Sequence, residues 1–204
     1  MSTTTERRTS LVAALALLAV TAAWGSTFFL TKDLVTRVPV LDYLAVRFAI
    51  AGVAVVVLFP KAVGRLSAHA RRRAVVLGLL YGVAQILQTT GLEHTAASVS
   101  GFVTGLYVVA TPLFAAVLLR QRIGAVTWGA VVLALAGLGV LTLSGFSVGY
   151  GEALTFVSAL LYALHIVGLG AWSNAGDAMG MSILQIIVVA VICLLASAPA
   201  TSAM

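Results

Sequence analysis

Polar and aromatic side chains recur at helical spacing within long apolar stretches of this sequence. The clearest pairs are Tyr81 with Gln85, Thr104 with Tyr107, and Tyr162 with His165. Residues three or four apart lie on the same face of a helix, so each pair forms part of a polar stripe. Such groups either line a hydrated pathway for a polar solute or join helices by hydrogen bonds, worth about 0.6 kcal/mol each. Three stripes in one chain favour a central polar cavity.

Arg47 is a charged residue about one turn inside an apolar segment. A charge at such a position is costly unless it is paired or reaches the surface of the apolar layer. Two interpretations stay open. Either Arg47 attracts an anionic group or gates the mouth of a cavity, or its side chain extends to the interface close to Asp42.

Trp24 and Thr27 lie in the middle of the first apolar segment, and Tyr162 and His165 lie in a later one. We expect these four residues to form facing walls of a binding site for a small molecule. His165 has a side chain that titrates near neutral pH, so it is a candidate for proton coupling. The alternatives are packing roles for the two large aromatic residues and a neutral histidine that is bonded to a hydroxyl.

Catalytic, metal and cofactor chemistry has little support in the sequence. Glu93 and His94 are adjacent, but no third metal ligand lies near them in the sequence. No glycine-rich phosphate loop with the lysine of a nucleotide-binding motif occurs. Residues 98–101 faintly resemble the serine motif of rhomboid proteases, with Ser100 as nucleophile and His165 as base. An intramembrane hydrolase is therefore kept as an alternative, but we expect no enzyme, no metal and no cofactor.

The segments that carry these residues are apolar and about twenty residues long. They are residues 11–31, 43–59, 74–92, 98–119, 125–144, 153–172 and 182–198. The chain is 61% hydrophobic and 9% charged, whereas a soluble domain carries about 25% charged residues. A helix needs about twenty apolar residues to cross the hydrocarbon core of a bilayer. The sequence therefore predicts an all-α, polytopic transmembrane helical bundle whose first segment is an uncleaved helix.

The basic residues gather in alternate connections between these segments. Nine of the twelve lie in the N-terminal tail or in the second and fourth connections; they are Arg7, Arg8, Lys61, Arg65, Arg71, Arg72, Arg73, Arg120 and Arg122. By the positive-inside rule, the N-terminus is cytoplasmic in a bacterial-type inner or plasma membrane. The basic residues then face the lipid headgroups. No basic face belongs to a soluble module, so no nucleic-acid partner is expected.

Pro112 lies inside the fourth apolar segment. Proline has no backbone N–H and its ring clashes with the carbonyl four residues earlier. We therefore expect a kink in this helix and a free carbonyl near Val108.

The sequence contains a weak internal repeat. One constant offset aligns Trp24 with Tyr162, Thr27 with His165, and Arg47 with Gln185. The offset contains five segments, an odd number, so the sixth segment must run opposite to the first. This is a five-helix inverted repeat, an architecture of secondary transporters. We expect a cytoplasmic tail at 1–10, a first repeat at 11–146 and an incomplete second repeat of two helices at 147–204.

Several motifs together resemble the EamA family of the drug/metabolite transporter superfamily. They are residues 24–27, 47–48, 91–98, 111–115, 119–123, 128–139 and 151–154. The resemblance implies ten helices in two five-helix repeats, so this chain looks like a truncated form with seven. Gln121 stands where the family usually has glutamate.

The resemblance implies transport of a small organic metabolite, such as an amino acid, an amine or a drug-like solute. Alternating access, with or without coupling to a gradient, would move it. A transport-incompetent or partner-dependent membrane component is the alternative, and the chain is a candidate for homodimerisation through its last segment. The candidate pathway residues are Trp24, Thr27, Arg47, Tyr81, Gln85, Thr104, Tyr107, Tyr162 and His165.

Overall fold

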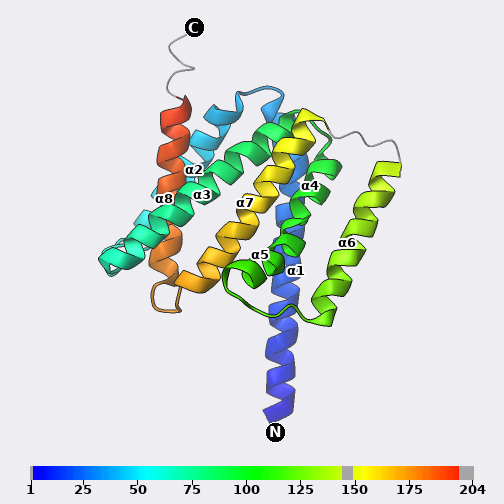
Figure 1. Ribbon diagram of the computed structural model, residues 1–204. Helices are drawn as coiled ribbons and strands as arrows, with labels where there is room; N and C mark the ends of the chain where they lie inside the picture. The colour runs from blue at the N-terminus through cyan, green and yellow to red at the C-terminus, as the bar shows by residue number, and fades with distance from the viewer. Residues whose placement is uncertain (1, 144–148, 198–204) are drawn as a thin grey trace.

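A computed structural model describes residues 2–143 and 149–197, and every regular element in these two ranges is a helix (Figure 1). The helices are α1 (Ser2–Val35), α2 (Val40–Leu58), α3 (Ala68–Glu93), α4 (Ala97–Gly105), α5 (Tyr107–Leu118), α6 (Ala125–Leu143), α7 (Tyr150–Trp172) and α8 (Ala178–Ser197). The predicted all-α class is confirmed. Six spans are long and apolar enough to cross a membrane, with α4 and α5 together forming one of them, and α6 adds a further apolar helix.

The helices alternate in direction, and the basic connections lie together (Figure 1). The N-terminus and the connections 59–67, 119–124 and 173–177 lie at the lower end of the bundle as drawn, which we call the basic end. Connections 36–39 and 94–96 lie at the other end. Helix α7 runs opposite to α1, as an inverted repeat requires.

Helix α3 lies at the centre of the packing and contacts α1, α2, α4, α7 and α8. Leu77 of α3 and Met181 of α8 belong to one buried cluster. A second cluster joins α2 to α8 and includes Leu44 and Cys193. Cys193 is fully buried there, as expected for a small apolar residue in mid-span.

Helix α1 lies on the outside of the bundle. All residues from 11 to 26 are exposed. Among the side chains of α1 that the structure describes, those of Thr31 and Val35 are buried. Its last turns are held by two polar contacts. The hydroxyls of Thr31 and Tyr43 are 3.1 Å apart, and the Lys32 ammonium donates to the carbonyls of Leu92 and Glu93 at the end of α3. Helix α1 is therefore fixed at one end and loosely packed along the rest of its length.

The fourth span is interrupted between α4 and α5. The interruption is at Leu106, whose N–H bonds to the Val103 carbonyl at 3.2 Å, and α5 then continues through Pro112. The kink expected at Pro112, with its free carbonyl near Val108, stays a prediction. Gly105 ends α4 directly before this break, and glycine is a poor helix former.

Candidate functional site

A small polar cavity lies between α1, α2 and α3. It is lined by Trp24, Thr27, Phe28, Thr31, Arg47, Gln85, Gln88, Thr89 and Leu92. Its volume is about 20 Å³, which is room for about one water molecule. Gln85, Gln88 and Thr89 are all less than 9% exposed, so their polar groups face the protein rather than the surrounding medium. At this volume the cavity is too small for an organic solute.

Among the described residues, Arg47 is the only cation that lines this cavity. Its guanidinium lies 6.0 Å from the ring centre of Tyr43 and 5.7 Å from that of Phe48, and one nitrogen is 3.5 Å from the Tyr43 hydroxyl. Within residues 2–143 and 149–197, no carboxylate oxygen lies within 4.0 Å of it, so it is not paired with Asp42. Aromatic faces stabilise the charge but leave its N–H donors free for another acceptor.

Gln88 connects the cavity to two other helices. Its side-chain N–H donates to the Thr104 hydroxyl of α4 at 3.0 Å, and its carbonyl accepts from the Tyr162 hydroxyl of α7 at 2.9 Å. All three side chains are at most 7% exposed. This chain of hydrogen bonds fixes the amide of Gln88, so its orientation in the cavity wall is set by α4 and α7.

A second polar cluster lies beside the first, on α3, α7 and α8. The Gln85 amide donates to the Tyr81 hydroxyl at 2.8 Å, and the Tyr81 ring centre lies 5.2 Å from that of His165. His165 Nε2 is 2.6 Å from the side-chain oxygen of Gln185. The Tyr81 and Tyr162 ring centres are 5.8 Å apart. Tyr81 thus bridges the cavity residue Gln85 and the imidazole on α7.

A larger apolar cavity of about 370 Å³ lies between α1 and α4. Trp24 and Phe28 line both cavities, and their ring centres are 6.2 Å apart. Tyr107 lies on the apolar side, with its ring centre 6.0 Å from that of Trp24. The two aromatic rings of α1 therefore separate a polar compartment from an apolar one.

The nine residues predicted from sequence occupy one connected region. Four of them line the small cavity: Trp24, Thr27, Arg47 and Gln85. Tyr81, Thr104, Tyr107 and Tyr162 contact one of these four residues or Gln88. His165 is one step further away and contacts Tyr81. Tyr162 and His165 do not line the cavity opposite Trp24; they form the neighbouring cluster.

Two central residues are absent from the predicted set. Gln88 lies three residues from Gln85 on the polar stripe that helical spacing predicts, but it is not among the nine candidate pathway residues. Phe28 has no polar signal in the sequence, and its place between two cavities depends on tertiary packing.

The hydrolase alternative requires a hydrogen bond between a serine and a histidine. His165 Nε2 instead contacts Gln185. The Ser100 hydroxyl is fully buried and has no partner among the described residues. The described part of the chain also contains no group of three or more metal-binding side chains. The geometry therefore gives this alternative no activated nucleophile.

A family model supplies the decisive comparison. The model described as the EamA-like transporter family matches residues 11–143, well over half of the chain. The chain belongs to the EamA-like transporter family. It is an integral membrane protein of the transporter type. No curated protein matches the chain, and no solved structure does. The matched range of this EamA-like chain contains α1 from residue 11 onward and all of α2 to α6, and with them the cavity and every residue that lines it.

The hydrogen bond between Gln88 and Tyr162 should stabilise the EamA-like bundle measurably. We expect Gln88→Leu to lower the free energy of unfolding by about 1–2 kcal/mol, because it breaks two interhelical hydrogen bonds. Tyr162→Phe breaks one of them. In the Gln88→Leu background, Tyr162→Phe should have a smaller effect than in the unmodified protein.

Unfolding can be followed in detergent through the single, buried Cys193 with a thiol-reactive fluorescent dye. One kcal/mol corresponds to a shift of about 2–4 °C for a chain of this size. An equal effect of Tyr162→Phe in both backgrounds would show that the two side chains are not coupled.

Proposed function

We propose that this protein moves a small organic solute, such as an amino acid, an amine or a drug-like molecule, across the inner or plasma membrane. The observation that carries the proposal is the cavity between α1, α2 and α3, where Arg47 has no carboxylate partner among the described residues. A charge inside a membrane protein is costly, and it usually marks a pathway for a substrate or an ion. Buried amides at Gln85 and Gln88 offer donors and acceptors beside it.

The arrangement of the two cavities supports a solute with a polar end and an apolar body. The polar end, an acidic group in particular, would take the place of water beside Arg47. The apolar body would lie against Trp24 and Phe28, which face the larger cavity. Small-molecule sites usually measure about 300–1,000 Å³, so the polar cavity must enlarge before a solute enters.

In the proposed mechanism, the polar cavity enlarges when the protein changes conformation during alternating access. Helix α1 is the element best suited to move, because it is anchored through Thr31 and Lys32 near its end and exposed along residues 11–26. Outward movement of its middle section would join the two cavities. His165 lies in the adjacent cluster and can take up a proton, so coupling to a pH gradient is part of the proposal.

The function is tested by reconstituting the full chain into sealed liposomes. The probes are a mixture of the twenty protein amino acids and, separately, a mixture of primary and quaternary amines, each isotopically labelled. We expect uptake of at least one compound above that of protein-free liposomes, measured with and without an imposed pH gradient. Uptake equal to that of the empty liposomes for every compound would contradict transport of these classes by this chain alone.

A second candidate function is that of a partner-dependent membrane component. It is favoured by the exposure of α1, where Trp24 lines both cavities and is nevertheless 41% exposed. The last apolar segment, α8, packs on α2 and α3 but keeps Leu194 and Leu195 exposed, so a homodimer through it stays a further form of this candidate. A homodimer through α1 would cover the exposed surface of that helix. Its mass in mild detergent should then be that of two chains, whereas a monomer would exclude this form of the proposal.

The proposed orientation places the basic end in the cytoplasm. The chain has only two lysines: Lys61 lies at the basic end and Lys32 near the opposite end. A membrane-impermeant amine reagent applied to sealed cells should modify Lys32 and leave Lys61 unmodified until the cells are lysed. Peptide mass spectrometry measures both sites. Modification of Lys61 in sealed cells would reverse the orientation.

A further inference from the structure

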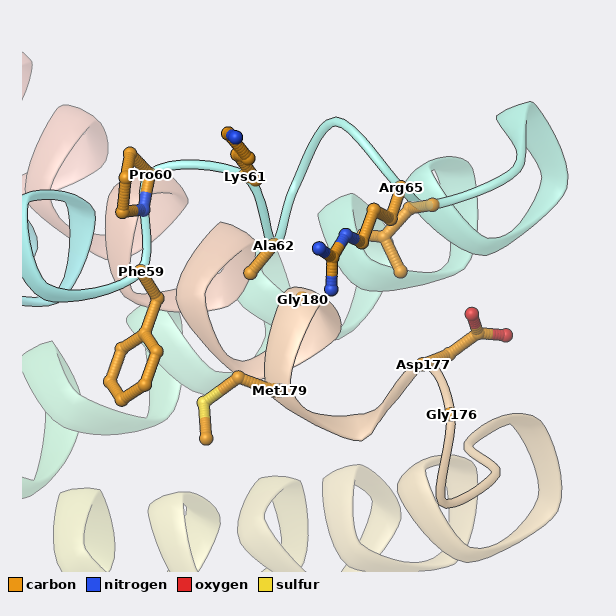
Figure 2. Close-up of a pocket in the computed structure, with 10 residues that line it drawn as sticks. Phe59, Pro60, Lys61, Ala62, Arg65, Gly176, Asp177, Met179 and Gly180 are labelled. Atoms are coloured by element: carbon orange, nitrogen blue, oxygen red, sulfur yellow. The ribbon is translucent and has the colours of Figure 1, made fainter.

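A cavity of about 330 Å³ lies at the basic end, away from the solute site. The connection between α2 and α3 forms one wall, and the start of α8 forms the other (Figure 2). Its lining residues are Phe59, Pro60, Lys61, Ala62, Arg65, Leu66, Gly176, Asp177, Met179 and Gly180. The cavity begins directly after the last residue of α2, Leu58, so it lies where a membrane span ends.

The charged and apolar groups of this cavity are separated. Figure 2 shows the Arg65 guanidinium extending over the first turn of α8, near Gly180, with Lys61 at the rim. The side chains of Phe59 and Met179 point together to the other side, away from Lys61. Both of these apolar side chains are exposed. One side of the cavity is thus cationic, and the other offers apolar surface that is continuous with the membrane-spanning part of α2.

The floor of the cavity is closely packed. A Cβ atom placed on Gly180 would lie 2.6 Å from the Ala62 carbonyl oxygen and 2.9 Å from Leu66, so the connection rests directly on α8. Helix α8 begins at Ala178, and its first turn adds the partial positive charge of a helix N-terminus to the same space. The positions of the two walls relative to each other are therefore fixed by backbone contact.

The other charged residues around the cavity leave its net charge positive. Asp177 is the one acidic residue that residues 2–143 and 149–197 contribute to the lining. Its carboxylate points away from Arg65 (Figure 2) and accepts a hydrogen bond from the Asn174 amide at 2.8 Å. Arg71 donates to the Gly64 carbonyl at 3.0 Å in the same connection. Arg73 lies over the Trp172 ring, 5.6 Å from its centre. These two arginines add positive charge on the same end of the bundle.

We propose that this cavity binds the headgroup of an anionic phospholipid, with its phosphate at Arg65 and Lys61 and one acyl chain along Phe59 and Met179. Basic pockets between membrane helices on the cytoplasmic side are suited to anionic headgroups, because each cation adjacent to the membrane surface strengthens binding about fivefold. The guanidinium of Arg65 can engage two phosphate oxygens at once. The exposed apolar side chains favour a lipid over free phosphate, because free phosphate has no apolar part that could contact them.

The test is lipid binding by the purified full chain in detergent, measured by native mass spectrometry. The probes are phosphatidylglycerol and phosphatidylcholine with the same acyl chains. We expect phosphatidylglycerol to bind at least about fivefold more tightly. Arg65→Ala and Lys61→Ala should each weaken its binding about fivefold. Arg122→Ala is the matched control, because Arg122 is an exposed arginine at the same end that does not line the cavity, and it should leave binding unchanged.

Two further measurements separate the lipid from free phosphate. Phe59→Ser should weaken phosphatidylglycerol binding, and inorganic phosphate at millimolar concentration should not displace the lipid. Equal binding of the two lipids, or equal loss on Arg122→Ala and Arg65→Ala, would overturn the proposed site. Complete displacement by inorganic phosphate together with an unchanged Phe59→Ser variant would overturn the assignment to a lipid. Arg65, Lys61 and Phe59 are all exposed, so these variants are expected to fold.

Discussion

Arg47→Ala is expected to lower solute uptake by reconstituted liposomes about 30-fold or more. Removing one partner of a buried, charge-assisted contact costs about 2–5 kcal/mol, and Arg47 is the only cation that the described part of the chain places in the cavity lining. Its contacts within the protein are weak, because they consist of two aromatic rings and a 3.5 Å contact to Tyr43. The loss should therefore appear in transport more than in stability.

Two variants control this result. Arg47→Lys keeps the charge but not the planar pair of donors, so uptake should fall by less than with Arg47→Ala. Arg122→Ala removes an exposed arginine outside the cavity and should leave uptake unchanged. If Arg47→Ala transports as well as the unmodified chain, Arg47 only extends to the membrane interface and the proposed solute contact is wrong.

Gly91→Ala is expected to destabilise the bundle by about 3 kcal/mol, the largest stability effect that the packing predicts. Helices α3 and α7 cross with their backbones in contact at this point. A Cβ atom on Gly91 would lie 2.6 Å from the Gly151 carbonyl oxygen and 3.0 Å from the Thr155 nitrogen. Backbone atoms cannot move aside as a flexible side chain can, so the helices must separate. The apparent unfolding midpoint should fall by about 6–12 °C.

The reciprocal variant tests the same crossing. A Cβ atom on Gly151 would lie 2.7 Å from the Gly91 carbonyl oxygen, so Gly151→Ala should show a comparable loss. Gly170→Ala is the matched control on α7, because no atom lies within 4 Å of its added Cβ and alanine favours the helix. The dye reaction of Cys193 reports all three midpoints. A Gly91→Ala protein as stable as Gly170→Ala would contradict the close crossing.

The membrane-spanning helices could be predicted from the sequence because their signal is local. Length and apolarity identified every span, and the buried position of Cys193 followed from them. The ends of the helices were predicted less accurately than their existence. The third helix begins at Ala68, six residues before the predicted position, because the Ser67 hydroxyl accepts a hydrogen bond from the Ala70 N–H and caps the helix within the basic connection.

The contacts between distant helices could not be predicted in the same way. The approach of Gly91 to Gly151 joins residues far apart in sequence, and glycine alone does not show which helix will meet it. The position of the break at Leu106 depends on how α4 and α5 pack, not only on the presence of Pro112. The burial of α3 against α7 and α8, with α1 left outside, is likewise a property of the assembled bundle.

The internal offset aligns residues that lie in two neighbouring polar groups. Trp24, Thr27 and Arg47 line one cavity. Their aligned counterparts are Tyr162, His165 and Gln185, of which the last two are hydrogen-bonded to each other. Tyr162 bonds to the cavity residue Gln88. The offset thus relates two groups of polar residues on either side of α3, which agrees with the antiparallel courses of α1 and α7.

Access of water-soluble reagents to position 27 tests the central claim most directly, because it does not require the solute to be known. Thr27 lines the polar cavity, whereas Leu18 on the same helix is exposed on the outer surface of the bundle, outside that lining. The measurement is the reaction rate of a membrane-impermeant maleimide with Thr27→Cys and Leu18→Cys, each in a Cys193→Ala background, from either side of sealed vesicles. A water-filled pathway predicts that Thr27→Cys reacts from both sides and that Leu18→Cys stays unreactive in lipid. If Thr27→Cys is as unreactive as Leu18→Cys from both sides, the cavity is only part of the packing between helices.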